Sequence, residues 1–183
     1  MDLSYVACIS YCHKPLDTAV AKHLHSLLEG YVIPPQLRRT PEQKHPGAVF
    51  TDRYDLPVGG ELTDGISQAL DHSQFLIVIC TPDAPKSPYL RQEVRYFIGK
   101  HGHDRVLPVL AAGTPEESIP RELLEGKEPL YVSVAGETPK QVLKNLNKEL
   151  PRLAALILGC PYDALLHHWK RSPLQRLLLA WRR

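Results

Sequence analysis

The stretch FLIVICTPDAPKSPYLRQEV, residues 75–94, contains two patterns that together predict a parallel α/β fold. Its first six residues form an unbroken apolar run, which is typical of a strand buried on both faces of a parallel sheet. A proline-rich loop follows at residues 81–88. Apolar residues then recur at the spacing of a helix: Leu90, Val94, Phe97 and Ile98. The stretch therefore predicts a buried strand, a loop at its carboxyl end and an amphipathic helix over 88–99.

Four further apolar runs of strand length alternate with helical stripes along the chain. The runs occupy residues 5–10, 48–51, 105–110 and 129–134. Apolar positions recur at helical intervals between Leu16 and Leu28, between Leu62 and Leu70, and between Val142 and Ile157. Residues 115–126 predict a weaker helix or an irregular segment. Pro151 lies inside the last stripe and predicts that this helix is kinked there or split in two.

Five strands that alternate with helices predict a flavodoxin-like α/β fold with three layers. The simplest sheet for it is five-stranded and parallel, in the order 2-1-3-4-5, with helices on both faces. In this order the first and third strands are neighbours where the winding reverses, and ligands bind at the carboxyl ends of strands beside such a point. We therefore expect a crevice lined by residues 10–15 and residues 81–88. The fold accounts for residues 1–158, and residues 159–183 form a basic extension rich in Leu and Trp.

The length and the charge of the chain exclude several classes of protein. Its 183 residues allow one domain with a short appendage. The 22 Lys and Arg residues are balanced by 20 Asp and Glu residues, so the chain lacks the clustered positive charge that nucleic-acid binding requires. Its four cysteines include no CxxC pair, and its start lacks the features of a signal peptide, which favours a cytoplasmic protein. No apolar stretch approaches the roughly 20 residues that span a membrane.

The expected crevice lacks the loops of common nucleotide-binding and hydrolytic enzymes. The turn after the first strand contains no glycine, whereas a GxGxxG loop needs glycine for close approach to a pyrophosphate. The chain also has no GxSxG nucleophile elbow. Paired histidines such as His23 and His25 do not have the spacing that places two rings on one face of a helix. A dehydrogenase, a serine hydrolase and a metal centre are therefore disfavoured.

Glu93 is the carboxylate with the best geometric reason for a role. At about 100° per residue it lies about 40° outside Phe97 on the helix over 88–99, and it shares an i,i+4 row with Tyr89. It therefore borders the buried face of the helix, two turns from the helix start and near the expected crevice. A carboxylate at such a boundary can also be paired with an arginine or cap a turn, and the geometry alone favours this structural interpretation.

Four segments of the chain each give a weak sequence signal, but together and in this order they form a specific pattern. They are YVACISYCH at 5–13, VFTDRYDLPVGGEL at 49–62, the stretch at 75–94 and RVLPVL at 105–110. The ISY start, the DRYDLPVGG loop and the pattern S-x-Y-x-x-x-E after the third strand are jointly the most specific. Over roughly residues 4–135 this set resembles a TIR (Toll/interleukin-1 receptor) domain of the bacterial type. The fold of that family is the five-stranded flavodoxin-like sheet, in agreement with the periodicity.

The resemblance implies an enzyme that acts on NAD+. Many TIR domains cleave NAD+ at the nicotinamide–ribose bond, which yields nicotinamide with ADP-ribose or a cyclised derivative. Their catalytic glutamate ends a W-x-x-x-E pattern, which here reads Tyr89 to Glu93, so the resemblance implies Glu93 as the catalytic residue. The departure is Tyr89, where tryptophan is usual. NAD+ is then a substrate, and neither a cofactor nor a metal is expected.

The resemblance also implies contacts to the substrate and to a second copy of the domain. The candidate substrate-binding residues are Ser10, Tyr11, His13, Asp55, Leu56, Gly59, Ser87 and Tyr89. An exposed loop histidine is an equally good interpretation of His13. In the family the loop that corresponds to residues 52–60 packs against a neighbouring TIR domain. The resemblance therefore implies self-association and low activity of the monomer, although a simple solvent-exposed turn is the alternative for this loop.

Two functions from different classes follow. The first is a TIR-domain NAD+ glycohydrolase or ADP-ribosyl cyclase that is activated by self-association, in bacterial anti-phage immunity. The second is a non-catalytic TIR interaction module for signalling or for mimicry of host TIR domains. Glu93 at the family spacing favours the enzyme. The extension at 159–183 predicts an extra helix packed on the domain, an amphipathic helix on a membrane or a partner, or a junction to a further region that tethers the domain.

Overall fold

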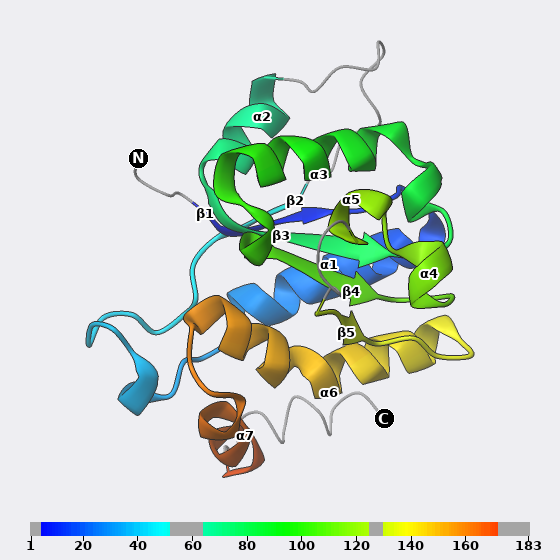
Figure 1. Cartoon of the computed structure of the whole chain (residues 1–183). Helices are drawn as coiled ribbons and strands as arrows, with labels where there is room; N and C mark the ends of the chain where they lie inside the picture. Colours follow the sequence, from blue (N-terminus) through cyan, green and yellow to red (C-terminus); the bar gives the residue numbers. More distant parts are fainter. Residues whose placement is uncertain (1–4, 52–63, 125–129, 172–183) are drawn as a thin grey trace.

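The apolar runs of the sequence form a parallel sheet in the computed structural model, which describes residues 5–51, 64–124 and 130–171 (Figure 1). The strands are β1 (Tyr5–Ser10), β2 (Val49–Thr51), β3 (Ser73–Cys80), β4 (Val106–Leu110) and β5 (Val132–Ser133). Their order is β2-β1-β3-β4-β5 and every pairing is parallel. The predicted fold class and strand order are confirmed.

The helices cover both faces of the sheet (Figure 1). They are α1 (Pro15–Glu29), α2 (Asp64–Asp71), α3 (Pro88–His101), α4 (Pro115–Ser118), α5 (Arg121–Leu124), α6 (Pro139–Leu158) and α7 (Tyr162–Arg171). Short 3-10 turns lie at η1 (Pro35–Leu37), η2 (Ala84–Lys86) and η3 (His103–Arg105). The segment expected to be a weak helix at 115–126 contains the two four-residue helices α4 and α5.

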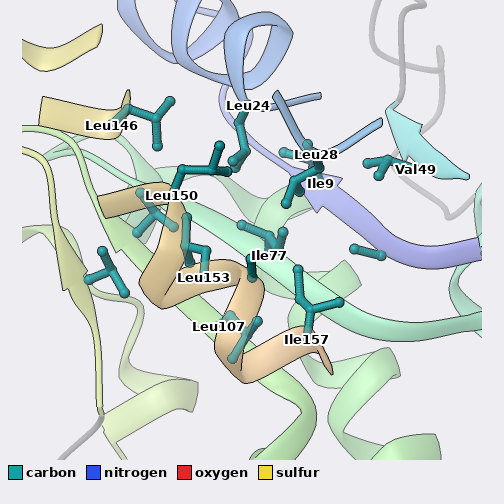
Figure 2. Packing of buried hydrophobic residues seen from close by; sticks show 14 of the residues in the cluster. Ile9, Leu24, Leu28, Val49, Ile77, Leu107, Leu146, Leu150, Leu153 and Ile157 are labelled. Atoms are coloured by element: carbon teal, nitrogen blue, oxygen red, sulfur yellow. The ribbon is translucent and has the colours of Figure 1, made fainter. Parts of the chain in front are cut away.

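Alternate residues of the strands pack into two separate cores, because successive side chains of a strand point to opposite faces. On one face, apolar residues of α1 and α6 pack against Ile9, Ile77 and Leu107 (Figure 2). On the other face, residues of α2 and α3 pack against Cys8 and Leu76. Strands β1 and β3 are thus buried on both faces, which explains why their sequences are continuous apolar runs rather than alternating ones.

Pro151 does not divide the last long helix of the domain. Its missing N–H leaves the carbonyl of Asn147 without a helical donor, yet α6 runs through it as one helix of 20 residues. The expectation of a split is therefore wrong. Leu146 and Leu150 before the proline, and Leu153 and Ile157 after it, are all buried in the same core, so packing keeps both halves within one helix (Figure 2).

The extension after the domain begins as a helix that packs on α6. Gly159 ends α6 in the left-handed conformation with φ of 65°, and α7 follows. Leu165 of α7 is fully buried in the core of α1 and α6, so this part of residues 159–183 is an extra helix on the domain. In the part of the chain that the structure describes, no helix is both long enough and apolar enough to cross a membrane.

Two leucines of α6 provide a matched test of this packing. Leu150 is 1% exposed and Leu156 is 42% exposed. We expect Leu150→Ala to lower the free energy of unfolding by about 2–5 kcal/mol, because it leaves a cavity in the core. Leu156→Ala should change it by less than about 0.5 kcal/mol. Urea denaturation followed by circular dichroism measures both, and equal losses would contradict the assigned orientation of α6.

Candidate functional site

Glu93 reaches the carboxyl end of β1 from helix α3. The hydroxyl of Ser10, the last residue of β1, donates a hydrogen bond to Oε2 of Glu93. Ser10 is 3% exposed and Glu93 is partly buried. The two residues are 83 positions apart in the sequence, and the pairing of β1 with β3 brings them together. The carboxylate therefore lies at the point where the sequence predicts the crevice.

The start of α3 determines where Glu93 lies along the helix. Pro88 occupies the first helical position, and the Oγ of Ser87 accepts a hydrogen bond from the backbone N–H of Leu90 at 3.3 Å. Leu90, Val94 and Phe97 are buried against the sheet. Glu93 borders this stripe, as its angular position predicts, and the partly buried Tyr89 lies one turn before it. Ser87, Tyr89 and Glu93 thus share one end of α3.

Tyr11 and His13 lie on the α1 side of the same loop. The side chain of Tyr11 packs into the core of α1 and α6, whereas Cys12 packs into the core of α3. The ring of Tyr11 lies 4.7 Å from the ring of the exposed His13. The structure therefore brings Ser10 to Glu93 and directs Tyr11 to the opposite face of the sheet. Asp55, Leu56 and Gly59, with the loop 52–60, lie outside the described residues.

Asp17 is a buried residue of this region that the sequence analysis did not single out. It lies in the first turn of α1, is 2% exposed, and its Oδ1 accepts a hydrogen bond from the hydroxyl of Thr81 at 2.9 Å. Burial raises the pKa of Asp17. Burial also raises the pKa of the Cys12 thiol to about 11, so this thiol is protonated at neutral pH. A charged residue inside the apolar stripe of the first helix is the signal that could have identified Asp17.

The comparisons with known proteins agree with this fold. A family model described as TIR domain matches residues 8–147, which is more than half of the chain. The chain belongs to the TIR domain family. It is 30% identical over 148 residues to the NAD(+) hydrolase ApTIR of Actinoplanes sp. (strain ATCC 31044 / CBS 674.73 / SE50/110). That match covers 76% of this chain and 19% of the relative, so the chain spans about a fifth of the length of that protein.

A solved structure of TIR domains is also similar to this chain. It is the activated Roq1 resistosome that directly recognises the pathogen effector XopQ. The TM-score is 0.44 at 18% sequence identity, and the match covers 92% of this chain and 86% of that one.

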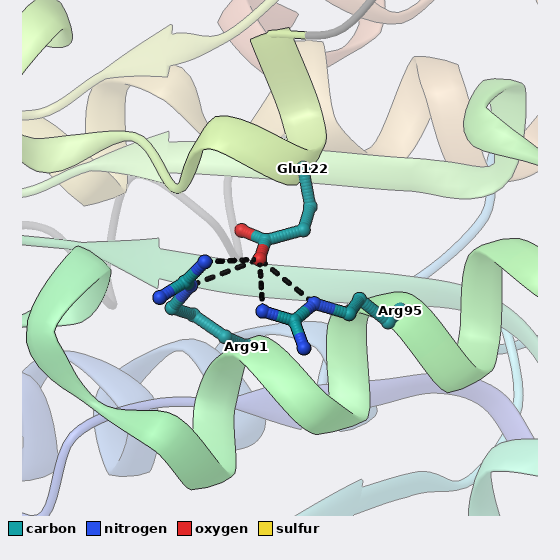
Figure 3. A network of polar contacts seen from close by, with 3 residues as sticks. All are labelled: Arg91, Arg95 and Glu122. Carbon is teal, nitrogen blue, oxygen red and sulfur yellow. Dashed lines mark hydrogen bonds and ion pairs between the residues drawn. The ribbon is translucent and has the colours of Figure 1, made fainter.

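The two arginines of α3 in this TIR domain bind a different carboxylate, that of Glu122 on α5 (Figure 3). The Nε and Nη2 atoms of Arg91 lie 2.9 and 2.8 Å from Oε1 of Glu122, and those of Arg95 lie at the same two distances. Oε2 is buried without a hydrogen-bond partner in the described structure. Arg91 and Arg95 thus fasten α5 to the outer side of the helix that carries Glu93.

The charge of Glu122 depends on these two arginines. Burial by itself would raise the pKa of Glu122, but the hydrogen bonds from Arg91 and Arg95 outweigh it and lower the pKa to about 2. The carboxylate therefore stays ionised under all ordinary conditions. Oε2 of Glu93 accepts a hydrogen bond from the hydroxyl of Ser10, whereas Oε1 of Glu122 accepts from two guanidinium groups.

The arrangement around Glu93 suits a particular kind of chemistry. A carboxylate that accepts a hydrogen bond from a hydroxyl can accept one from a ligand hydroxyl in the same way, and its negative charge stabilises a positive charge that develops nearby. Within residues 5–51, 64–124 and 130–171, no group of three His, Cys, Asp or Glu side chains lies together in a way that could hold a metal ion.

Glu122→Gln tests the ion pairs of α3 and α5. The folded pKa of Glu122, about 2, lies below its ordinary value of 4.5, so the ionised group stabilises the fold above pH 4.5 and loses this effect as the pH falls toward 2. At neutral pH we expect the variant to lose about 1–3 kcal/mol of unfolding free energy.

The difference between the wild type and Glu122→Gln should shrink as the pH falls from 4.5 toward 2, as measured by urea denaturation at several pH values. The control is Glu149→Gln, which breaks the more exposed pair with Arg152. It should cost less than about 1 kcal/mol. A pH-independent difference would contradict the assignment of a charged interaction to Glu122.

Proposed function

We propose that this TIR domain cleaves the nicotinamide–ribose bond of NAD+, with Glu93 as the catalytic carboxylate. The observation that carries the proposal is the position of Glu93, which lies beside Ser10 at the carboxyl ends of β1 and β3 and accepts a hydroxyl hydrogen bond. A relative that is named an NAD(+) hydrolase and is 30% identical supports the choice of substrate.

The reaction needs a negative charge near the ribose, and it does not need a general acid to protonate the leaving group. The bond between the ribose carbon and the nicotinamide nitrogen breaks, and both of its electrons go to that nitrogen. Nicotinamide leaves as a neutral molecule, so its nitrogen takes up no proton. The ribose becomes an oxocarbenium-like cation, whose charge a nearby carboxylate stabilises. Water then adds to the ribose carbon and loses a proton, which gives ADP-ribose. Attack by a nucleophile of the same molecule, in place of water, gives a cyclic product.

The residues around Glu93 have separate roles in this proposal. Ser10 hydrogen-bonds to Glu93 until ribose hydroxyls replace it as donors to the carboxylate. Tyr89, one helical turn before Glu93, offers a flat face for the nicotinamide ring, with less area than tryptophan would offer. The remaining contacts to the dinucleotide that we propose come from His13, Asp55, Leu56, Gly59 and Ser87, whereas Tyr11 packs in the core of α1 and α6 and supports the loop from behind.

The proposed enzyme is active when copies of the domain assemble. The loop at residues 52–60 is the part that we propose packs against a neighbouring copy. Exposed apolar surface at the far edge of the sheet supports association, since Leu130 and Tyr131 beside β5 are 90% and 39% exposed. In the cell we propose a cytoplasmic role in bacterial anti-phage immunity, in which assembly leads to loss of NAD+.

Glu93→Gln should abolish NAD+ cleavage. The variant keeps the shape of the side chain and an oxygen that accepts from Ser10, but it removes the negative charge that stabilises the cation. We expect the rate of nicotinamide release to fall by at least about a hundredfold. The measurement is nicotinamide formation by mass spectrometry with concentrated or artificially clustered protein. Glu116→Gln, at an exposed glutamate of α4, is the control and should leave the rate unchanged. Equal rates for wild type and Glu93→Gln would exclude the proposed mechanism.

Activity should also depend on assembly. If copies must associate, nicotinamide release per protomer rises as protein concentration rises, and it rises further when the domain is fused to a scaffold that clusters it. A series of protein concentrations with fixed NAD+ provides the measurement, and light scattering of the same samples gives the oligomeric state. A rate per protomer that is constant over the whole series would contradict activation by self-association.

A further inference from the structure

Three polar contacts join the loop after β1 to the segment after β3. At the strand ends, Ser10 donates to Glu93. Further along, the side chain of Ser87 lies close enough to the thiol of Cys12 to lower its pKa against the effect of burial. The third contact begins at Asp17, in the first turn of α1, whose Oδ1 accepts a hydrogen bond from the hydroxyl of Thr81 at 2.9 Å. The first two contacts involve side chains already assigned to the crevice or next to it, whereas the pair of Asp17 and Thr81 has no place in the proposed reaction.

A continuous set of hydrogen bonds connects Thr81 to the first turn of α3. The carbonyl of Thr81 accepts from the N–H of Ala84 at 2.9 Å, and the carbonyl of Ala84 accepts from the N–H of Ser87 at 3.2 Å. The Oγ of Ser87 then accepts from the N–H of Leu90, and its carbonyl accepts from the N–H of Arg91. Each step is local, and together they link a side chain of α1 to the start of the helix that carries Glu93.

These bonds and the backbone between them close a ring at the carboxyl ends of β1 and β3. Starting from Ser10, the chain runs through its loop to Asp17, crosses to Thr81, follows the turn to Ser87 and α3, and returns from Glu93 to Ser10. The crossing at Asp17 lies in the interior, because Asp17 is 2% and Thr81 is 4% exposed. A buried carboxylate is expensive to desolvate, and an apolar residue would fill the same space without that cost. The hydrogen bond to Thr81 is what distinguishes Asp17 from such a residue.

We propose that Asp17 is a positioning residue: through Thr81 it fixes the first turn of α3 and thereby the place of Glu93 beside Ser10. The inference rests on the proposed function, since it gives Glu93 its importance. The pair acts on the start of α3, whereas the contacts of Arg91 and Arg95 with Glu122 hold the side of the helix away from Glu93. Asp17 itself touches no substrate in this scheme.

The test compares Thr81→Val with Thr81→Ser in the full chain. Valine keeps the size of the side chain and removes the donor, whereas serine keeps the donor and loses a methyl group. We expect Thr81→Val to lower kcat for nicotinamide release by about tenfold or more through misplacement of Glu93. KM should change by less than about twofold, and Thr81→Ser should retain kcat within about twofold. Asp17→Asn in the Thr81→Val background should cause no further loss of kcat, because both changes break the same contact.

The matched control is Thr138→Val. Thr138 caps the start of α6, which packs on the face of the sheet away from α3, and its side chain accepts from the N–H of Gln141. This change removes a threonine hydroxyl and lowers stability without touching the crevice, so kcat should remain that of the wild type. A loss of kcat equal to that of Thr81→Val would show that the effect is general destabilisation and would overturn the proposal.

Hydrogen exchange measures the position of α3 without any reaction. The amides of Leu90 and Arg91 should exchange faster in Thr81→Val than in the wild type and Thr81→Ser, while the amides of β3 and β4 keep their protection. Unchanged exchange at Leu90 and Arg91 would overturn the role of Asp17. A wild type that releases no nicotinamide when clustered would exclude the proposed function alone, because the exchange comparison still decides whether Asp17 positions the helix.

Discussion

The parallel pairing of β1 with β3 is the constraint on which the other features of this TIR domain depend. Both strands are buried on both faces, so their polar backbone can be satisfied only by neighbouring strands. Parallel pairing places the ends of both strands at one edge of the sheet, with Ser10 opposite Val78. The chain must leave that edge through two loops, and each loop leads directly into a helix. The contact between Ser10 and Glu93 depends on this pairing, because it brings the end of β1 next to the segment that leads into α3.

Helix α3 makes polar contacts on two of its sides. On its outer side, two guanidinium groups bind one oxygen of Glu122, which keeps that carboxylate charged and fixed. On its inner side, a neutral hydroxyl from Ser10 meets Glu93. Both partners are ionised at Glu122, whereas Ser10 is a neutral donor to Glu93. The structure thus fixes the helix through an ion-pair network that is separate from the residue that we propose reacts.

Much of this architecture could be predicted from the sequence, because the strands of a parallel sheet are marked by apolar runs and the helices by their stripes. The position of Glu93 at the edge of the buried face also followed from helical geometry, since only residues 88–97 were needed. Pro151 shows where such local reasoning fails: the residue disfavours a helix, but buried leucines on both sides of it decide the outcome. The ion pair of Glu122 with Arg91 also could not be predicted, because the two residues lie 31 positions apart in the sequence and no periodicity relates them. Tyr11 was assigned to the crevice by resemblance, although strand alternation directs it to the opposite core from Cys12.

In the proposed reaction the hydroxyl of Ser10 is a donor that a substrate hydroxyl can replace. One hydroxyl donor to Glu93 is then exchanged for another, and the net free-energy change of that exchange is small. The negative charge of Glu93 stabilises the transition state. The helix that carries Glu93 is positioned by bonds made elsewhere, at Thr81, Ser87 and Glu122. The contacts that position α3 are therefore separate from the contact that a substrate hydroxyl replaces.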